Sequence, residues 1–85
     1  MKSFSYIIKN PQGLHARIVG LVAAEALKCE STVKIRSGER SAEGKDLIGL
    51  MGLCAACGDP LEVEISGRDE GEIYEKIKRI MEENL

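Results

Sequence analysis

Leu61-Glu62-Val63-Glu64-Ile65-Ser66 is the segment that decides the fold of this chain. Apolar Leu61, Val63 and Ile65 alternate with polar residues, which is the period-two pattern of a strand with one buried face. The preceding sequence Gly58-Asp59-Pro60 predicts a loop. Because no other segment alternates as regularly, we expect this strand in the interior of a sheet.

The segments on either side show two patterns, strand alternation and helical spacing. Strands are predicted over residues 3–8, 32–36 and 40–43, with a hairpin turn at 37–39. Helices are predicted over 16–28, from a cap at Asp46 to Leu53, and after a capping-box start formed by Asp69 and Glu72. The expected buried stripes of the first and last helices comprise Val19, Val22, Ala23, Ala26, Ile73, Ile77, Ile80 and Met81. The order β-α-β-β-α-β-α predicts an α+β fold with a four-stranded antiparallel sheet and three helices on one face.

Length and composition exclude several classes of protein. The 85 residues provide material for one core, so we expect a single domain over residues 1–85. A net charge of -2 and only three aromatic residues argue against a nucleic-acid partner, which would need a basic field and stacking platforms. No apolar run reaches the roughly 20 residues of a membrane span, and residues 1–5 lack signal-peptide features. We therefore expect a cytoplasmic protein without membrane insertion.

The only histidine, His15, stands between a turn at residues 10–13 and the predicted helix, with Arg17 two positions further on. A helix start offers unpaired backbone N–H groups and the positive end of the helix dipole, both of which attract phosphate. That setting favours a neutral, exposed imidazole with a lone pair for attack on phosphorus, and Arg17 can add a charge-assisted contact. The alternative that spacing alone leaves open is a capping or surface histidine without chemistry.

The three cysteines are an odd number in a chain without an export signal, so we expect reduced thiols. Cys54 and Cys57 have the spacing of a redox motif, but they follow a predicted helix, whereas that motif lies at a helix start. A zinc site would need two further ligands, and only Cys29 and His15 are available. We therefore predict small, partly buried packing residues at Cys54 and Cys57, and neither metal nor cofactor.

Two predicted helices carry apolar residues where a solvated face is expected. On the first helix these are Gly20, Leu21, Ala24 and Leu27, opposite the core stripe. The second helix has almost no polar face at all. The residues alone leave two readings open, a docking surface or tolerated exposed apolar groups.

Two motifs identify a family. The segments Gly13-Leu14-His15-Ala16-Arg17 and Gly44-Lys45-Asp46-Leu47-Ile48-Gly49-Leu50-Met51-Gly52-Leu53 strongly resemble those of HPr, the histidine-containing phosphocarrier of the bacterial sugar phosphotransferase system. The resemblance extends over the whole chain, including Gly67-Arg68-Asp69-Glu70 before the last helix. It implies an open-faced β-sandwich that carries phosphate and is not an independent enzyme.

The resemblance also implies a mechanism and partners. His15 would accept a phosphoryl group on Nδ1 from phosphorylated enzyme I and pass it to enzyme IIA domains, while Arg17 would stabilise the phosphate. The protein would be a monomer that needs no cofactor or metal, with a transcriptional regulator as a further partner. The docking patch around the histidine would consist of Ala16, Gly20, Leu21, Ala24, Leu27, Leu47, Ile48 and Met51.

Two positions depart from the family pattern. Ile18 stands where the family usually has a proline, so we expect a less preorganised first helical turn. Asp46 stands where Gram-positive members carry a regulatory serine that HPr kinase phosphorylates, and its permanent negative charge is expected to weaken docking to an acidic enzyme I surface. These departures motivate an alternative function, an HPr-like regulatory docking module with little or no phosphotransfer. A small redox or metal protein using Cys54 and Cys57 is a third hypothesis.

Overall fold

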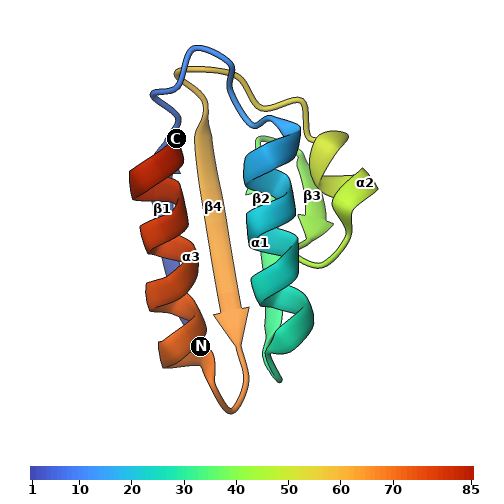
Figure 1. Cartoon of the computed structure of the whole chain (residues 1–85), viewed down its shortest axis with the longest axis vertical. Coiled ribbons are helices and arrows are strands. Elements are labelled where there is room, and N and C mark those ends of the chain that lie inside the picture. Colours follow the sequence, from blue (N-terminus) through green and yellow to red (C-terminus); the bar gives the residue numbers. More distant parts are fainter.

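Seven elements follow one another in the predicted order in the computed structural model, which describes residues 1–85 (Figure 1). The strands are β1 (Lys2–Ile7), β2 (Thr32–Ser37), β3 (Arg40–Glu43) and β4 (Pro60–Ser66). The helices are α1 (Ala16–Lys28), α2 (Leu47–Met51) and α3 (Glu70–Asn84). The predicted α+β order is therefore confirmed.

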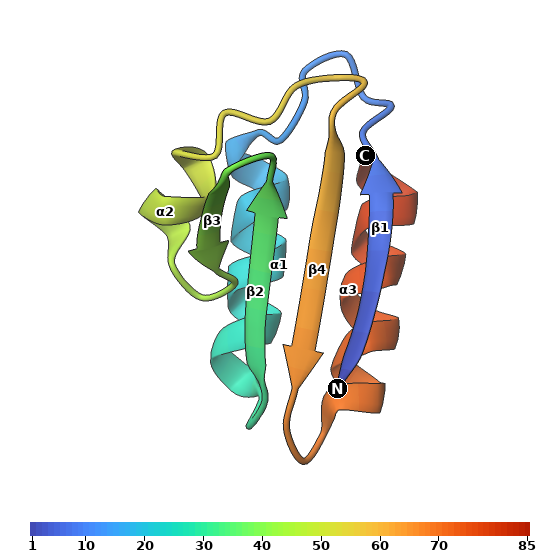
Figure 2. The same ribbon diagram turned by 180° about the vertical axis from the view of Figure 1, so that it is seen from behind.

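The four strands form one antiparallel sheet in the order β1-β4-β2-β3. The strand with the clearest alternation, β4, lies between β1 and β2, so its predicted interior position is confirmed (Figure 2). Its central residue Val63 pairs with Phe4 of β1 and with Ile35 of β2. This register puts the apolar residues of three strands on one face of the sheet.

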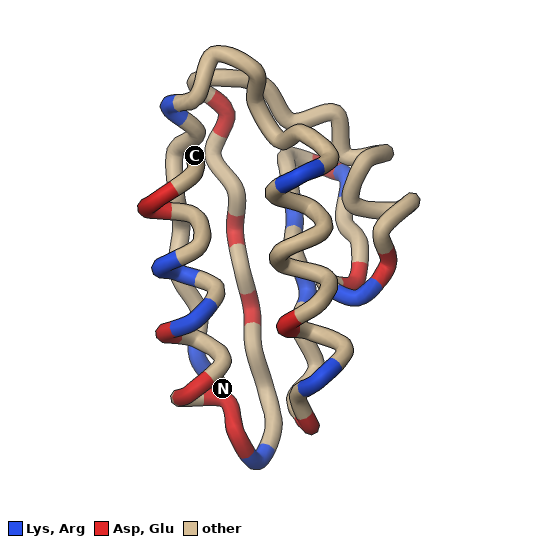
Figure 3. The backbone as a smooth tube through the Cα atoms, in the orientation of Figure 1, with Lys and Arg blue, Asp and Glu red and all other residues tan.

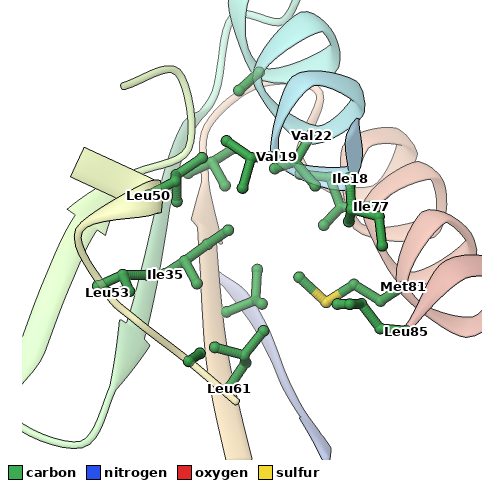
Figure 4. Packing of buried hydrophobic residues seen from close by; sticks show 14 of the residues in the cluster. Ile18, Val19, Val22, Ile35, Leu50, Leu53, Leu61, Ile77, Met81 and Leu85 are labelled. Carbon is green, nitrogen blue, oxygen red and sulfur yellow. The ribbon is translucent and has the colours of Figure 1, made fainter. Parts of the chain in front are cut away.

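Helices α1 and α3 cover that apolar face, and the opposite face of the sheet is open (Figures 1 and 2). The short α2 lies beside β3 and contacts α1. Leu61, Val63 and Ile65 of β4 are fully buried against the two long helices. Figure 4 shows Val19 and Val22 of α1 opposite Ile77 of α3 in this core.

Ile18 is completely buried as well, although the predicted stripe of α1 did not include it (Figure 4). It lies four residues before Val22 and eight before Ala26, so it belongs to the same face of the helix. The position that departs from the family pattern is therefore part of the core.

The second helix is shorter than predicted. It begins after Asp46 as expected, but it ends at Met51, with Gly52 as its C-cap and the Gly52 N–H donating to the Ile48 carbonyl at 3.0 Å. Leu53 lies beyond the helix and is buried in the core. The chain has to leave the helix at Gly52 so that the Leu53 side chain can reach this core.

The predicted capping box at the start of α3 is wrong. Asp69 is the N-cap residue, but its side chain makes no capping bond and instead accepts hydrogen bonds from the Glu30 N–H, at 3.0 Å, and from the Ser31 hydroxyl. Glu72 pairs with Lys76 at 3.2 Å instead of reaching back to the cap. The Ser31 hydrogen bond, followed by that from Glu30, lowers the pKa of Asp69 below its usual value. The Glu30 N–H and the Ser31 hydroxyl, from a loop distant in sequence, have thus replaced the local N–H that the capping box predicted.

Candidate functional site

The turn before α1 rests on the loop that follows α2. Gly13 has a φ of +68°, and its N–H donates to the Asn10 carbonyl at 2.9 Å. The next N–H, that of Leu14, donates to the Ala55 carbonyl at 3.0 Å. A Cβ at Gly13 would lie 2.6 Å from the same Ala55 oxygen, which explains why glycine is needed here. These contacts fix the position of His15 at the start of α1.

His15 is the N-cap residue of α1, with an extended backbone, and its carbonyl accepts the N–H groups of Ile18 and Val19, each at 3.1 Å. Its side chain makes no capping hydrogen bond. The residue is half-buried and not exposed as predicted, because Nε2 is enclosed by the protein and has no hydrogen-bond partner. The other ring nitrogen, Nδ1, is not enclosed in this way, so Nε2 is the less available of the two.

The first turn of α1 provides hydrogen-bond donors beside the imidazole. The backbone N–H groups of Ala16 and Arg17 donate to no carbonyl of the chain. The first turn holds no acidic residue, and the exposed Arg17 guanidinium has no carboxylate within 4.0 Å. Free N–H groups at a helix start and an unpaired cation in the same turn are both features that attract a phosphate.

The predicted docking residues all lie at the surface of α1 and α2, two helices that are in contact. The five large ones have exposed fractions between 41% and 84%: Leu21, Leu27, Leu47, Ile48 and Met51. Ala16 and Ala24 are exposed as well, and Gly20 is intermediate. Figure 3 shows that α1 carries few charged residues and α2 none, whereas charges alternate along α3. An apolar surface of this kind is suited to binding a protein.

Leu27 is the outlying member of this set. At about 1.5 Å of rise per residue, it lies roughly 16 Å along the α1 axis from Ala16. It lines a shallow hollow of about 280 Å³ with Glu43 and Lys45, which precede α2. The docking residues therefore extend along α1, with α2 and the residues before it on one flank.

Asp46 caps α2, since its Oδ1 accepts the Gly49 N–H at 3.0 Å. A Cβ at Gly49 would lie 2.5 Å from the Asp46 carboxylate, so glycine leaves room for this contact. The carboxylate remains at the surface, adjacent to the exposed Leu47 and Ile48. The predicted cap is confirmed, and it introduces one negative charge beside an otherwise apolar helix.

The prediction that Cys54 and Cys57 are partly buried is wrong, because both are exposed. Ala55, between them, is the residue that packs inward, and it directs its neighbours toward solvent. The structure contains no group of three or more His, Cys, Asp or Glu side chains placed to hold a metal ion.

Sequence reasoning missed Ala55 as part of the His15 site. The only available signal was Gly13, since a glycine before the histidine indicates either a positive φ or a close backbone neighbour. The glycine alone does not indicate which segment of the chain lies against it.

Comparisons with known proteins agree on one family. The family model described as the PTS HPr component phosphorylation site matches residues 2–83. The phosphocarrier protein HPr of Mycoplasma genitalium is 37% identical over 86 residues, covering 99% of this chain and 97% of that protein. A multiphosphoryl transfer protein of Xanthomonas campestris is 30% identical over 79 residues, which cover 93% of this chain but 9% of that protein. The solved histidine-containing phosphocarrier protein of a Mycoplasma has a TM-score of 0.93 at 29% identity, covering 96% of this chain and 93% of that one. No helix of this chain is both long and apolar enough to cross a membrane.

Proposed function

This chain belongs to the HPr family of phosphocarrier proteins of the phosphotransferase system, and from that membership we propose that its His15 receives a phosphoryl group from enzyme I and donates it to enzyme IIA domains. The observation that carries the proposal is the environment of His15. Its Nε2 is enclosed, which leaves Nδ1 as the candidate acceptor, and the residue directly precedes two free N–H groups and the unpaired Arg17.

In the first transfer, the Nδ1 lone pair of His15 attacks the phosphorus of phosphorylated enzyme I. A phosphorus–nitrogen bond forms as the bond to the donor breaks, and the donor keeps the electron pair of that bond. The N–H groups of Ala16 and Arg17 and the Arg17 guanidinium stabilise the negative charge on the phosphoryl oxygens. The second transfer is the same reaction with His15 as the leaving group.

The shape of the surface favours a protein over a small molecule as the reaction partner. His15 lines neither of the two hollows of the structure. The apolar side chains of Leu47, Ile48 and Met51 are instead available for contact with a protein surface. A carrier has to leave each partner quickly, so an interface with a modest apolar centre and a charged rim is appropriate.

The direct test is incubation with enzyme I and phosphoenolpyruvate, followed by intact mass measurement. We expect an acid-labile gain of one phosphoryl group, which is lost in His15→Ala. Addition of an enzyme IIA domain should then discharge the carrier. Arg17→Ala should keep the modification site but slow its formation by about a hundredfold to a thousandfold, as for the loss of a preorganised hydrogen-bond donor. No mass gain, or a gain that persists in His15→Ala, would contradict the proposal.

The alternative, a regulatory docking module, is favoured by one observation, the Asp46 carboxylate within the predicted docking surface. This alternative predicts that the chain binds enzyme I in a titration but gains no phosphoryl group. Phosphorylation of His15 at a rate that supports repeated transfer would exclude it.

A further inference from the structure

The proposed function leaves one pair of nucleophilic side chains without a role, the thiols of Cys54 and Cys57. Both are exposed, and two residues separate them. Their sulfur contacts are long, at 4.0 Å from Cys54 Sγ to the Met51 carbonyl and 3.6 Å from Cys57 Sγ to the Lys9 carbonyl. Both thiols are therefore accessible to a reagent in solution.

Cys29 differs from this pair in its burial and in the length of its sulfur contacts. It is partly buried, and its Sγ lies 3.2 Å from the Ala26 carbonyl and 3.3 Å from the Ser31 carbonyl. Because two backbone carbonyls contact its thiol and the residue is partly buried, Cys29 serves as an internal control for reactivity.

The loop that carries the exposed pair supports the turn before His15. Ala55 lies between the two cysteines, is 6% exposed, and accepts the Leu14 N–H at 3.0 Å. In Figures 1 and 2 this loop runs beside the loop that leads into α1. Any bend of the chain between Cys54 and Cys57 displaces the carbonyl on which that turn depends.

Closing a disulfide requires such a bend. The chain from Cys54 to Ala56 runs without a turn or bend. Three fully extended peptide units span at most about 10 Å, whereas the Cα atoms of a disulfide lie roughly 4.4–6.8 Å apart, so the closer such a segment is to extended, the more it has to bend. Cys54 has a φ of +52°, a conformation that residues other than glycine rarely adopt, and a rearrangement of the loop would release it.

We propose that Cys54 and Cys57 are a redox-sensitive pair whose oxidation to an intramolecular disulfide withdraws the Ala55 carbonyl from Leu14 and slows phosphoryl transfer through His15. The effect on transfer rests on the proposed function, whereas the disulfide and the loop movement do not.

The oxidant is a low-molecular-weight disulfide. One cysteine thiolate attacks it, forms a mixed disulfide and releases one thiolate of the reagent. The second cysteine thiolate then attacks the mixed disulfide at the protein sulfur, forming the Cys54–Cys57 bond and releasing the second reagent thiolate. The two protons of the protein thiols end on the two released thiols. The protein loses two electrons and the reagent disulfide gains them.

The first experiment treats the whole chain with oxidised glutathione, alkylates the remaining thiols and digests with trypsin. Both cysteines fall in one tryptic peptide, residues 46–68, and Cys29 falls in another. We expect the 46–68 peptide to lose two hydrogen atoms and to carry neither an alkyl group nor glutathione. Two alkylated cysteines, or a persistent glutathione adduct, would overturn the proposal.

The second experiment measures amide hydrogen exchange at Leu14 in the reduced and oxidised proteins. Loss of the hydrogen bond to Ala55 should speed this exchange by about tenfold. Unchanged exchange in a protein that contains the disulfide would overturn the coupling to the His15 turn.

The third experiment measures phosphorylation of His15 by enzyme I and phosphoenolpyruvate. Oxidation should slow it by about tenfold, since a displacement of ~1 Å at a reacting group can cost up to ~100-fold. A reductant should restore the rate, and Cys54→Ser and Cys57→Ser should resist the oxidant, while Cys29→Ser remains sensitive. Equal rates before and after oxidation would overturn the effect on transfer. Absence of phosphorylation in both states would instead refute the proposed function, and the first two experiments would still decide the disulfide.

Discussion

Replacement of Gly13 by alanine tests the contact that positions the histidine. The added Cβ meets two penalties in the structure. The φ of +68° lies in the left-handed region, where an L-residue costs about 1–2 kcal/mol. The Cβ would also lie 2.6 Å from the Ala55 oxygen and 2.9 Å from the Ala56 Cα, both backbone atoms that cannot rotate away.

The second penalty can be relieved only by movement of the loop. Separation of the two segments breaks the hydrogen bond from the Leu14 N–H to the Ala55 carbonyl, which contributes about 0.5–1.5 kcal/mol. With lost packing around Ala55, we expect Gly13→Ala to lower the free energy of unfolding by about 2–4 kcal/mol. A chain of 85 residues has a total of roughly 4–13 kcal/mol, so this loss is a large fraction of the stability of the fold.

Gly38→Ala is the matched control. Gly38 has a φ of +62°, but a Cβ there would meet no atom within 4 Å. The control therefore carries only the conformational cost of about 1–2 kcal/mol, and both variants change the unfolded chain in the same way. Urea denaturation of the three proteins measures the difference. Equal losses in Gly13→Ala and Gly38→Ala would refute the argument that the Ala55 contact stabilises the turn.

Three further substitutions have defined outcomes. Asp46→Ser keeps a capping oxygen, so the free energy of unfolding should change by less than about 1 kcal/mol. Without the Asp46 carboxylate, enzyme I should phosphorylate His15 faster, and HPr kinase should gain a site at residue 46. No change in either phosphorylation assay would contradict the proposed effect of the carboxylate. Ile18→Pro removes a fully buried side chain and an N–H that donates to the His15 carbonyl. Urea denaturation should therefore show that the free energy of unfolding falls by about 2 kcal/mol or more. An unchanged rate of His15 phosphorylation would contradict the idea that Ile18 leaves the first turn less preorganised. The lowered pKa of Asp69 means that its carboxylate stabilises the fold above its usual pKa of 3.8, and that this contribution is lost as the pH falls through the lower folded value. Asp69→Asn should therefore be less stable than the parent at pH 7 and lose less stability on acidification; parallel pH profiles would show that the contact with Ser31 has no such effect.

The order and boundaries of most elements followed from the sequence because they depend on local patterns. Alternation in residues 61–66 identified the central strand, and helical spacing located α1 from Ala16 to Lys28. The position of His15 before α1 is also a local property, since a turn and a helix start flank it in the chain.

Two of the wrong predictions concern segments where a distant interaction competes with a local one. The sequence predicted a local capping N–H for the Asp69 carboxylate, but Ser31 and Glu30 bind it instead. Gly52 and Leu53 fitted a longer helix, but burial of Leu53 ended α2 earlier. The free energy of the whole fold decides such competition, and a short segment of sequence does not show which distant groups take part in it.

The sequence by itself determined the element order, the single histidine with its neighbouring arginine, and the apolar character of the surface around α2, because composition and periodicity are properties of the chain. Only the tertiary structure decided that Nε2 of His15 is enclosed and which segment supports the turn before this residue. The contact of Gly13 with Ala55 depends on two loops that are about 40 residues apart in sequence and meet only when the sheet forms. Their closeness is a result of β4 lying between β1 and β2, which fixes both loops at the same end of the molecule.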